Sequence, residues 1–292
     1  MKETVNKDTY QTLKEIKISS QPFQKSVVPM WKPDTGQSEY SIMVATPVHS
    51  ECSIHYTQAL LAFQQKCMSN GILVSFTLLK SSLVTQGRNL CVNTFMEESI
   101  KHPYSHMLFI DSDIEFSFET IMKLIAADKD IVAAPYPLKD LDWEKIAKRI
   151  KHKNITDGNT MSKQGFTWPL KLEGKNEVTV IGGVAEVTHA PTGCMLIKKQ
   201  VFEKMIKELP ELKINQPTVI NGKMVEKEFM YNFFDCYHEP ETKKYYGEDF
   251  GFCKRWAEIG GKCHILVDEY ITHIGEYRFT GRLMDDLDFK KD

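Results

Sequence analysis

The chain of 292 residues lacks a long apolar segment, an internal repeat and an excess of charge of either sign. No run approaches the roughly 20 apolar residues that a membrane-spanning helix needs, so we expect no transmembrane segment. A formal net charge of −2 offers no basic surface for a phosphate backbone, so we expect no nucleic-acid partner.

Paired cysteines are missing as well. The chain has seven cysteines, an odd number, and no two of them have the Cys-x-x-Cys spacing of a zinc site or redox centre. Several lie in apolar patterns, which predicts buried free thiols. Residues 1–20 are polar and charged, without the apolar core of a signal peptide, so we expect a cytoplasmic protein.

Strands and helices are predicted to alternate along most of the chain. Short apolar runs predict strands, and stretches with helical periodicity lie between them. The predicted strands include residues 41–45, 72–79, 106–110, 130–134, 185–188, 194–197 and 264–267. This order predicts an α/β fold with a mainly parallel, twisted sheet flanked by helices.

The domain organisation follows from where this alternation stops. Residues 1–37 are polar and contain three prolines, which predicts an N-terminal arm, and residues 38–292 are expected to form a single domain. Within it, residues 139–178 show no clear periodicity. A stretch of this length predicts a long irregular insertion, either a functional lid or a disordered segment.

The tripeptide Asp111-Ser112-Asp113 directly follows the apolar run of residues 106–110. That run predicts a buried parallel strand, and ligands of open α/β sheets bind at the carboxyl ends of such strands. Two carboxylates there can hold a hard divalent cation whose other ligands are water and substrate phosphates. The alternative is a polar turn in which an Asp or Ser caps the following segment.

Glu248 and Asp249 stand at the predicted start of the last long helix. Carboxylates in a first helical turn can simply cap the helix and interact with its dipole. The functional alternative is that one of them faces a cleft as a general base, which requires an acceptor proton within reach and a suitable pKa.

Two further segments suit a phosphate-bearing ligand. Gly87-Arg88-Asn89 is predicted to open a helix, where an arginine and free backbone N–H groups would bind an anion or nucleotide, unless Arg88 is only a surface side chain. His273 follows the last predicted strand, and its imidazole could supplement distant carboxylates at a metal ion, although a lone His is more often structural. Gly275 would permit close backbone approach to a phosphate.

Taken in order, these segments resemble the nucleotide-sugar-dependent glycosyltransferases of the GT-A fold, in particular small soluble enzymes of bacteria, phages and large algal viruses. The resemblance covers about residues 40–279 and includes an Asp-x-Asp motif. It is carried by Val44-Ala45-Thr46-Pro47, Gly87-Arg88-Asn89, residues 108–113, residues 133–137, residues 191–197, residues 247–250 and His273-Ile274-Gly275.

The resemblance implies metal-dependent transfer of a hexosyl or pentosyl group from a nucleotide-sugar donor to a hydroxyl of a glycan or glycoconjugate acceptor, with inversion. UDP is the favoured carrier because it is the commonest in such enzymes. The implied donor-binding residues are Thr46, Pro47, Val48, His49, Arg88, Asn89, Asp111, Ser112 and Gly275.

The resemblance also implies catalytic and metal-binding roles. Asp111 and Asp113, directly or through water, would hold Mn²⁺ or Mg²⁺, and His273 would complete the protein ligands. The ion would neutralise the charge on the departing nucleotide. Asp249 would deprotonate the acceptor hydroxyl, and Glu248 would position donor or acceptor.

Residues 139–178 match no such pattern, and Tyr136, Trp143 and Trp168 either stack on sugar faces or pack the loop. One alternative function is a sugar nucleotidyltransferase, but that class would be expected to carry a Gly-rich phosphate loop, which residues 46–50 lack. Another is a non-catalytic glycan- or nucleotide-binding module in which the carboxylates are only caps. A hydrolase with two carboxylates fits an Asp-x-Asp at a strand end less well.

Overall fold

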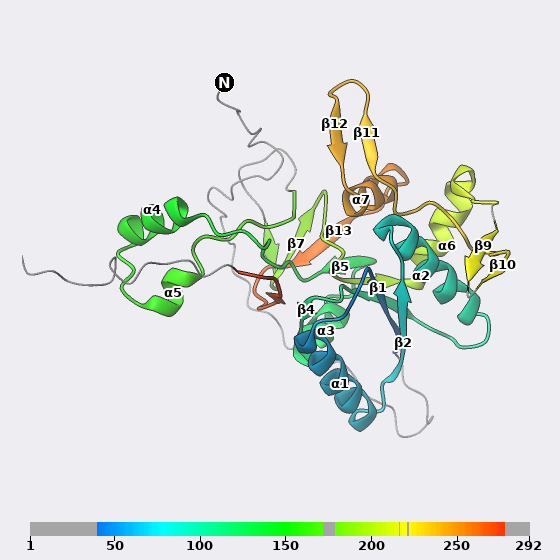
Figure 1. Ribbon diagram of the computed structural model, residues 1–292, viewed down its shortest axis with the longest axis horizontal. Helices are drawn as coiled ribbons and strands as arrows, with labels where there is room; N and C mark the ends of the chain where they lie inside the picture. The colour runs from blue at the N-terminus through cyan, green and yellow to red at the C-terminus, as the bar shows by residue number, and fades with distance from the viewer. Residues whose placement is uncertain (1–39, 172–178, 216, 221, 278–292) are drawn as a thin grey trace, which may run out of the picture.

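Eight strands form one central sheet, in the order β2-β1-β3-β8-β5-β13-β7-β6. The structure is a computed structural model that describes residues 40–171, 179–215, 217–220 and 222–277 (Figure 1). The strands of this sheet are β1 Ser41–Val48, β2 Leu73–Lys80, β3 His106–Ile110, β5 Ile131–Ala133, β6 Val180–Ile181, β7 Val184–Val187, β8 Cys194–Lys198 and β13 Cys263–Leu266.

The direction of the strands confirms a mixed, mostly parallel sheet. Six strands run in the same direction: β1, β2, β3, β5, β6 and β13. Strand β1 pairs parallel with β2 and β3, and β13 pairs parallel with β5. The antiparallel strand β8 lies between β3 and β5, and the antiparallel strand β7 lies between β13 and β6. Strands β7 and β8 run against them. The carboxyl ends of β1 and β3 therefore meet at one edge of the sheet.

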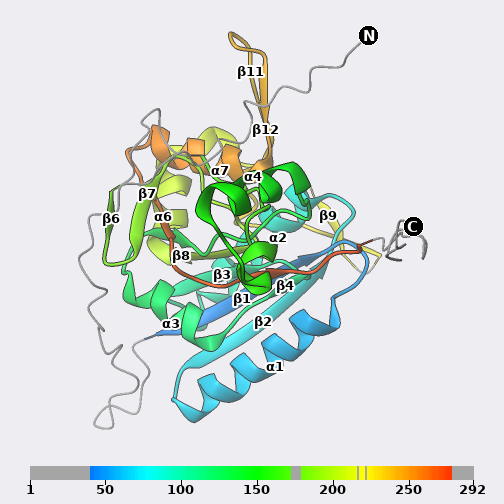
Figure 2. The same cartoon turned by 90° about the vertical axis from the view of Figure 1, so that its left-hand side faces the viewer.

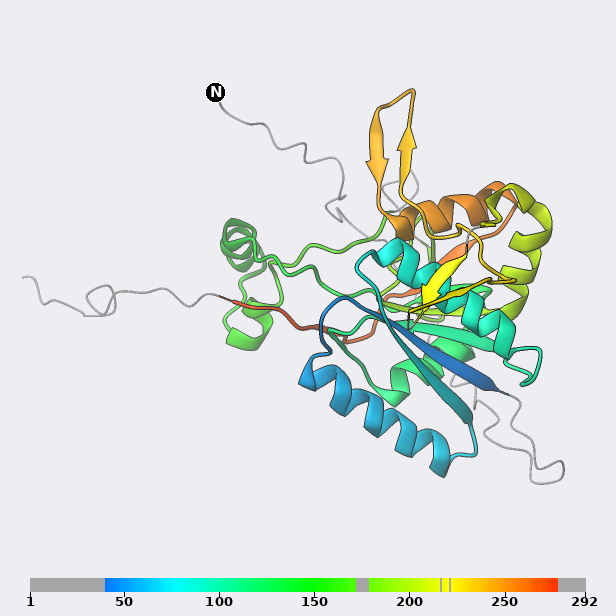
Figure 3. The same cartoon turned by 45° about the vertical axis from the view of Figure 1, so that its right-hand side comes forward.

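Successive side chains of the central strands enter two different apolar layers, as the two-residue period of a strand requires. Ile42 and Val44 of β1 pack beneath helices α1 (Ile54–Ser69) and α3 (Phe118–Ala126). Met43 and Ala45 face the opposite layer, which contains α2 (Val84–Glu98), α6 (Lys199–Glu208) and α7 (Glu248–Glu258). Figures 2 and 3 show helices on both faces of the sheet.

Local capping signals determine where two of the helices begin. The Ser53 side chain accepts the Tyr56 N–H at 3.0 Å, and α1 spans the predicted residues 54–69. Ser117 caps α3 in the same way, through Thr120. Gly71, at a φ of 65°, follows the end of α1.

Helix α2 begins earlier than its sequence predicts. We expected Gly87-Arg88-Asn89 to open it, but it starts at Val84, and the Gly87 N–H already donates to the Leu83 carbonyl at 2.9 Å. The backbone N–H groups of this tripeptide are therefore not at a helix N-terminus, so the prediction that they are free to bind an anion was wrong, while the role of Arg88 stays a prediction. The extra turn was missed because Leu83, the N-cap residue, has no capping side chain.

The insertion predicted to be irregular contains two helices, α4 (Trp143–Lys153) and α5 (Gly158–Ser162). We call residues 138–171 the insertion lobe; it projects from the sheet in Figure 1. Asp142 caps α4 by accepting the Lys145 N–H at 2.8 Å. The apolar periodicity of α4 is weak in the sequence, because Ile146 is the one residue of this helix that is buried.

Residues 210–246 form short elements rather than a continuous loop. They are a 3-10 helix, Pro210–Leu212, and two antiparallel hairpins: β9 Thr218–Ile220 with β10 Lys223–Val225, and β11 Tyr237–Glu239 with β12 Lys244–Tyr246. The β11–β12 hairpin extends away from the sheet next to the start of α7 (Figure 3). Among the described residues, no helix is both long and apolar enough to cross a membrane.

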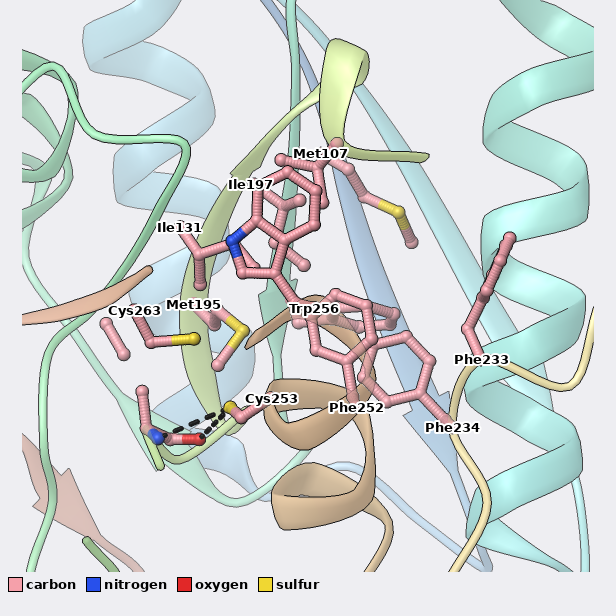
Figure 4. Close-up of a cluster of buried hydrophobic side chains, with 14 of the residues drawn as sticks. Met107, Ile131, Met195, Ile197, Phe233, Phe234, Phe252, Cys253, Trp256 and Cys263 are labelled. Atoms are coloured by element: carbon pink, nitrogen blue, oxygen red, sulfur yellow. Dashed lines mark hydrogen bonds between the residues drawn. The ribbon is translucent and has the colours of Figure 1, made fainter. Parts of the chain in front are cut away.

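Helix α7 is fixed against the sheet by aromatic packing and by a glycine. Phe252 and Trp256 point into the core, and the rings of Phe252 and Phe234 stack at a centroid distance of 4.2 Å (Figure 4). Gly251 lies so close to the backbone carbonyl of Asp235 that a Cβ at this position would collide with it. The start of α7 therefore depends on the absence of a side chain at residue 251.

Replacing this glycine tests the packing. Gly251→Ala should lower the free energy of unfolding by roughly 1–3 kcal/mol, because backbone must shift to admit the methyl group. In the control Gly158→Ala on α5, the new Cβ meets nothing within 4 Å, and stability should change little. Urea denaturation of both variants measures the difference, and equal stabilities would contradict this contact.

Candidate functional site

A shallow pocket of about 240 Å³ opens where β1 and β3 end. One wall is the end of β1, and the other is the tripeptide that follows β3. Its lining residues are Pro47, Val48, His49, Ser81, Val84, Asp111, Ser112 and Asp113. The structure thus brings three predicted nucleoside-pocket residues together with the predicted Asp-x-Asp motif.

Thr46 was also predicted to line the nucleoside pocket, but it does not. Its side chain is fully buried, and its hydroxyl hydrogen-bonds the Tyr56 hydroxyl at 2.7 Å. The pocket wall begins at Pro47. Thr46 therefore joins β1 to α1 beneath the pocket and does not line it.

Arg88 is buried in the protein and joins the end of β3 to the start of α7. Its side chain is 3% exposed, its Nε donates to Glu248 Oε1 at 3.2 Å, and its Nη2 donates to Asp111 Oδ2 at 3.1 Å. Burial alone would lower the pKa of Arg88, but the two carboxylates raise it, so the guanidinium stays charged. Its Cζ also lies 5.3 Å from the centroid of the Phe109 ring.

Two polar atoms of this ion pair have no hydrogen-bond partner within the described part of the chain. They are Arg88 Nη1 and Asp111 Oδ1, both buried. Asp111 Oδ1 lies 3.0 Å from Arg88 Nη2, but the hydrogen bond from that nitrogen goes to Oδ2, so Oδ1 contacts the guanidinium as an ion pair only. Buried groups of this kind are costly unless a ligand or water satisfies them.

Asn89, predicted to bind the donor, has a structural role in this fold. Its Oδ1 accepts the Phe234 N–H at 2.9 Å, and its Nδ2 donates to Asn232 Oδ1 at 3.1 Å. The side chain is 2% exposed. It therefore anchors residues 232–234 to α2, and its hydrogen-bonding groups face protein partners.

A short antiparallel pairing brings His273 to Asp113. Strand β14 (Thr272–His273) pairs with β4 (Ile114–Glu115), and the Ile274 N–H donates to the Asp113 carbonyl at 2.8 Å. His273 Nε2 consequently lies 3.5 Å from Asp113 Oδ2. Residues 160 positions apart in sequence thus meet at the carboxyl end of β3.

The tautomer of His273 follows from its second nitrogen, Nδ1, which lies 2.9 Å from the Pro137 carbonyl oxygen. A carbonyl oxygen can only accept, so Nδ1 carries the proton of this hydrogen bond. Nε2 is therefore the nitrogen that faces Asp113, and it is the one available to a metal ion when it carries no proton. Metal-binding histidines are typically oriented in this way, by donating their other N–H to a backbone carbonyl or carboxylate.

Asp113 has a second neighbour, Lys139, whose Nζ lies 2.5 Å from Oδ2. Burial raises the pKa of Asp113, but the hydrogen bonds and charges of His273 and Lys139 outweigh it and lower the pKa to about 2. The stem of Lys139 lies against Gly275, where a Cβ would come within 2.6 Å of Lys139 Cδ. Gly275, predicted to admit a phosphate, admits this lysine side chain.

These residues fit a divalent cation in part. Asp113 and His273 provide a carboxylate oxygen and an imidazole nitrogen side by side, and one oxygen of Asp111 has no hydrogen bond. In the ranges that the structure describes, no three His, Cys, Asp or Glu side chains are gathered closely enough to form a complete site. An ion here would need Asp113 and His273, with Asp111 reached directly or through water.

Asp249 and Glu248 occupy different environments although they are adjacent. Glu248 is paired with Arg88, whereas the Asp249 carboxylate accepts the N–H of Phe250 at 2.8 Å. Burial, followed by the charge of Glu248, raises the pKa of Asp249 to about 6. Asp249 therefore has the pKa of a group that can accept a proton near neutral pH.

The aromatic residues considered for sugar contact separate into two groups. Tyr136 is buried, and its ring lies against Gly193 and edge-on to His273 at a centroid distance of 5.0 Å. It therefore packs the site from within. Trp143 and Trp168 instead line a pocket of about 790 Å³ between the insertion lobe and residues 267–277.

Sequence reasoning missed Lys139 as a residue of the site. Nothing in its local sequence distinguishes it from the other lysines of the insertion. Its position depends on the path of the chain after Pro137 and on the β4–β14 pairing, both of which are contacts between distant segments.

Comparison with solved structures found similar folds, two of which are described here. No protein-family model matches the chain, and no curated protein matches it. The crystal structure of A197 from STIV is 15% identical, with a TM-score of 0.41 over 81% of this chain and 86% of that one. A glycosyltransferase involved in the glycosylation of the major capsid of PBCV-1 is 11% identical, with a TM-score of 0.28 over 58% and 69%.

The ion pairs of Arg88 predict a large loss of stability when the guanidinium is removed. Arg88→Met should destabilise the protein by roughly 3–5 kcal/mol, because two largely covered carboxylates, Asp111 and Glu248, lose the cation that they share. The control Arg149→Met removes a guanidinium that bonds a backbone carbonyl and should cost much less. Urea denaturation of both variants checks this, and equal losses would contradict it.

Proposed function

We propose that this protein is a metal-dependent glycosyltransferase. It transfers a hexosyl or pentosyl group from a nucleotide sugar, with UDP as the favoured carrier, to a hydroxyl of a glycan or glycoconjugate, and it inverts the anomeric centre. The observation that carries the proposal is the convergence of Asp113 and His273 beside the pocket at the end of β1. A carboxylate and a carbonyl-oriented imidazole at a strand end suit an ion that holds substrate phosphates.

Donor binding uses the two sides of that pocket. Pro47, Val48 and His49 form the wall for the nucleoside. Asp113 and His273 would hold Mn²⁺ or Mg²⁺, and Asp111 would add a ligand directly or through water. The ion would supply positive charge to the diphosphate leaving group. Arg88 contributes a fixed cation behind Asp111, and its buried Nη1 has no hydrogen-bond partner among the described residues.

The transfer itself needs one base. The acceptor oxygen forms a bond to the anomeric carbon while the bond from that carbon to the phosphate oxygen breaks, and the hydroxyl proton passes to Asp249. The raised pKa of this residue supports the assignment, because a carboxylate with pKa about 6 is a better proton acceptor than an ordinary one. Glu248, held by Arg88, positions the site.

Removing the proposed metal ligand should separate metal binding from folding. Asp113→Asn keeps the shape of the side chain but removes its charge, so Mn²⁺ affinity measured with UDP present should fall roughly 10- to 100-fold. The control is Asp140→Asn, which removes the charge of an exposed carboxylate at the root of the insertion lobe. Isothermal titration calorimetry measures both. Unchanged Mn²⁺ affinity in Asp113→Asn would exclude this metal site.

Removing the proposed base should leave donor binding intact. Asp249→Asn should reduce turnover roughly 10²- to 10⁴-fold, measured as nucleotide released from the sugar donor, with little change in nucleotide affinity. In the unsubstituted protein, kcat/KM should rise with pH through about 6, because only the ionised Asp249 carboxylate accepts a proton. A normal rate in the variant would show that the base lies elsewhere.

A further inference from the structure

The side chains of Lys139 and His273 both lie next to one oxygen atom of Asp113. Asp113 Oδ2 lies 2.5 Å from Lys139 Nζ and 3.5 Å from His273 Nε2. His273 is held in place from its other side by the Pro137 carbonyl. The lysine ammonium thus reaches the same carboxylate oxygen that the imidazole Nε2 faces.

A divalent cation could not bind that oxygen while the lysine stays. Mg²⁺ takes oxygen ligands at about 2.0–2.1 Å, and other small divalent ions bind only slightly farther away. An ammonium already 2.5 Å from the same oxygen would face the ion at close range, with strong mutual repulsion. Binding of the ion therefore requires Lys139 to move.

We infer that Lys139 is a built-in counter-cation of the proposed metal site, which neutralises Asp113 in the absence of metal and is displaced when a divalent ion binds. The inference rests on the metal site of the proposed function, and it adds that the Lys139 ammonium competes with the metal ion for Asp113. The Lys139 side chain is 40% exposed, so it has solvent into which to move.

The displacement has a structural consequence, because Lys139 stands at the root of the insertion lobe. The lobe is closed by its own hydrogen bonds, such as Leu138 N–H to the Thr167 carbonyl at 2.8 Å and Lys145 Nζ to the Phe166 carbonyl at 2.6 Å. Lys139 ties this closed unit to Asp113 and packs on Gly275. Release of the lysine loosens that tie.

The second pocket lies at this same junction. Lys139, His273 and Gly275 line the 790 Å³ pocket, whereas Asp113 lines the smaller one. The Lys139–Asp113 pair therefore stands between the two pockets. Loading of the metal site on one side therefore changes the wall of the pocket on the other.

The test uses Mn²⁺ alone as the probe, in titration calorimetry or by electron paramagnetic resonance of free Mn²⁺. Lys139→Met removes the competing charge and keeps most of the stem, so Mn²⁺ should bind about 3- to 10-fold more tightly than to the unsubstituted protein. Lys148→Met is the matched control, because Lys148 pairs with Glu144 on the surface of α4. It should leave Mn²⁺ affinity unchanged.

Hydrogen exchange over residues 138–171 provides a second readout, independent of affinity. Mn²⁺ should increase exchange at the root of the lobe in the unsubstituted protein, and Lys139→Met should show the increase without Mn²⁺. Equal or weaker Mn²⁺ binding by Lys139→Met would overturn the inference while leaving the metal site in place. Failure of both proteins to bind Mn²⁺, with or without UDP, would overturn the proposed metal site itself.

Discussion

The buried guanidinium of Arg88 is the constraint on which the rest of the site depends. It donates to Asp111 at the end of β3 and to Glu248 at the start of α7, two segments that the sheet and the helix layer would otherwise place independently. With Asp111 fixed, Asp113 follows two residues later, and with Glu248 fixed, Asp249 follows next to it. Breaking a buried pair of this kind is strongly destabilising, because its partners keep their charge without compensation.

The same arrangement gives four carboxylates three different environments. Asp111 and Glu248 pair with Arg88, Asp113 faces His273 and Lys139, and Asp249 lies half-buried beside Glu248 without an ion pair of its own among the described contacts. Burial and hydrogen bonding move the pKa of Asp113 down to about 2 and that of Asp249 up to about 6. Groups whose environments separate their pKa values in this way are suited to separate tasks, cation binding and proton transfer.

Much of the fold could be predicted from local signals. The alternation of apolar runs with helical periodicity is set by burial on both faces of the sheet, and α1 and α3 begin where Ser53 and Ser117 cap them. The location of a pocket at the end of β3 follows from the general geometry of parallel strands. These features depend on residues close together in sequence, so the sequence carries them directly.

The remaining features depend on distant contacts. The family resemblance implied that Thr46 and Asn89 bind the donor, but in the fold both side chains hydrogen-bond within the protein, Thr46 to Tyr56 and Asn89 to Phe234. The β4–β14 pairing that brings His273 to Asp113 is two residues long on each side, too short to show a strand pattern. Lys139 has no local signal at all. Its role arises from where the insertion lobe leaves the sheet.

The most direct measurement is the anomalous diffraction of crystals grown with Mn²⁺ and UDP. The account predicts a manganese peak bound to Asp113 Oδ2 and His273 Nε2, with the diphosphate beside it, the nucleoside against Pro47–His49, and the Lys139 ammonium moved away from Asp113. A nucleotide bound at this pocket without manganese, or manganese bound only elsewhere, would contradict it.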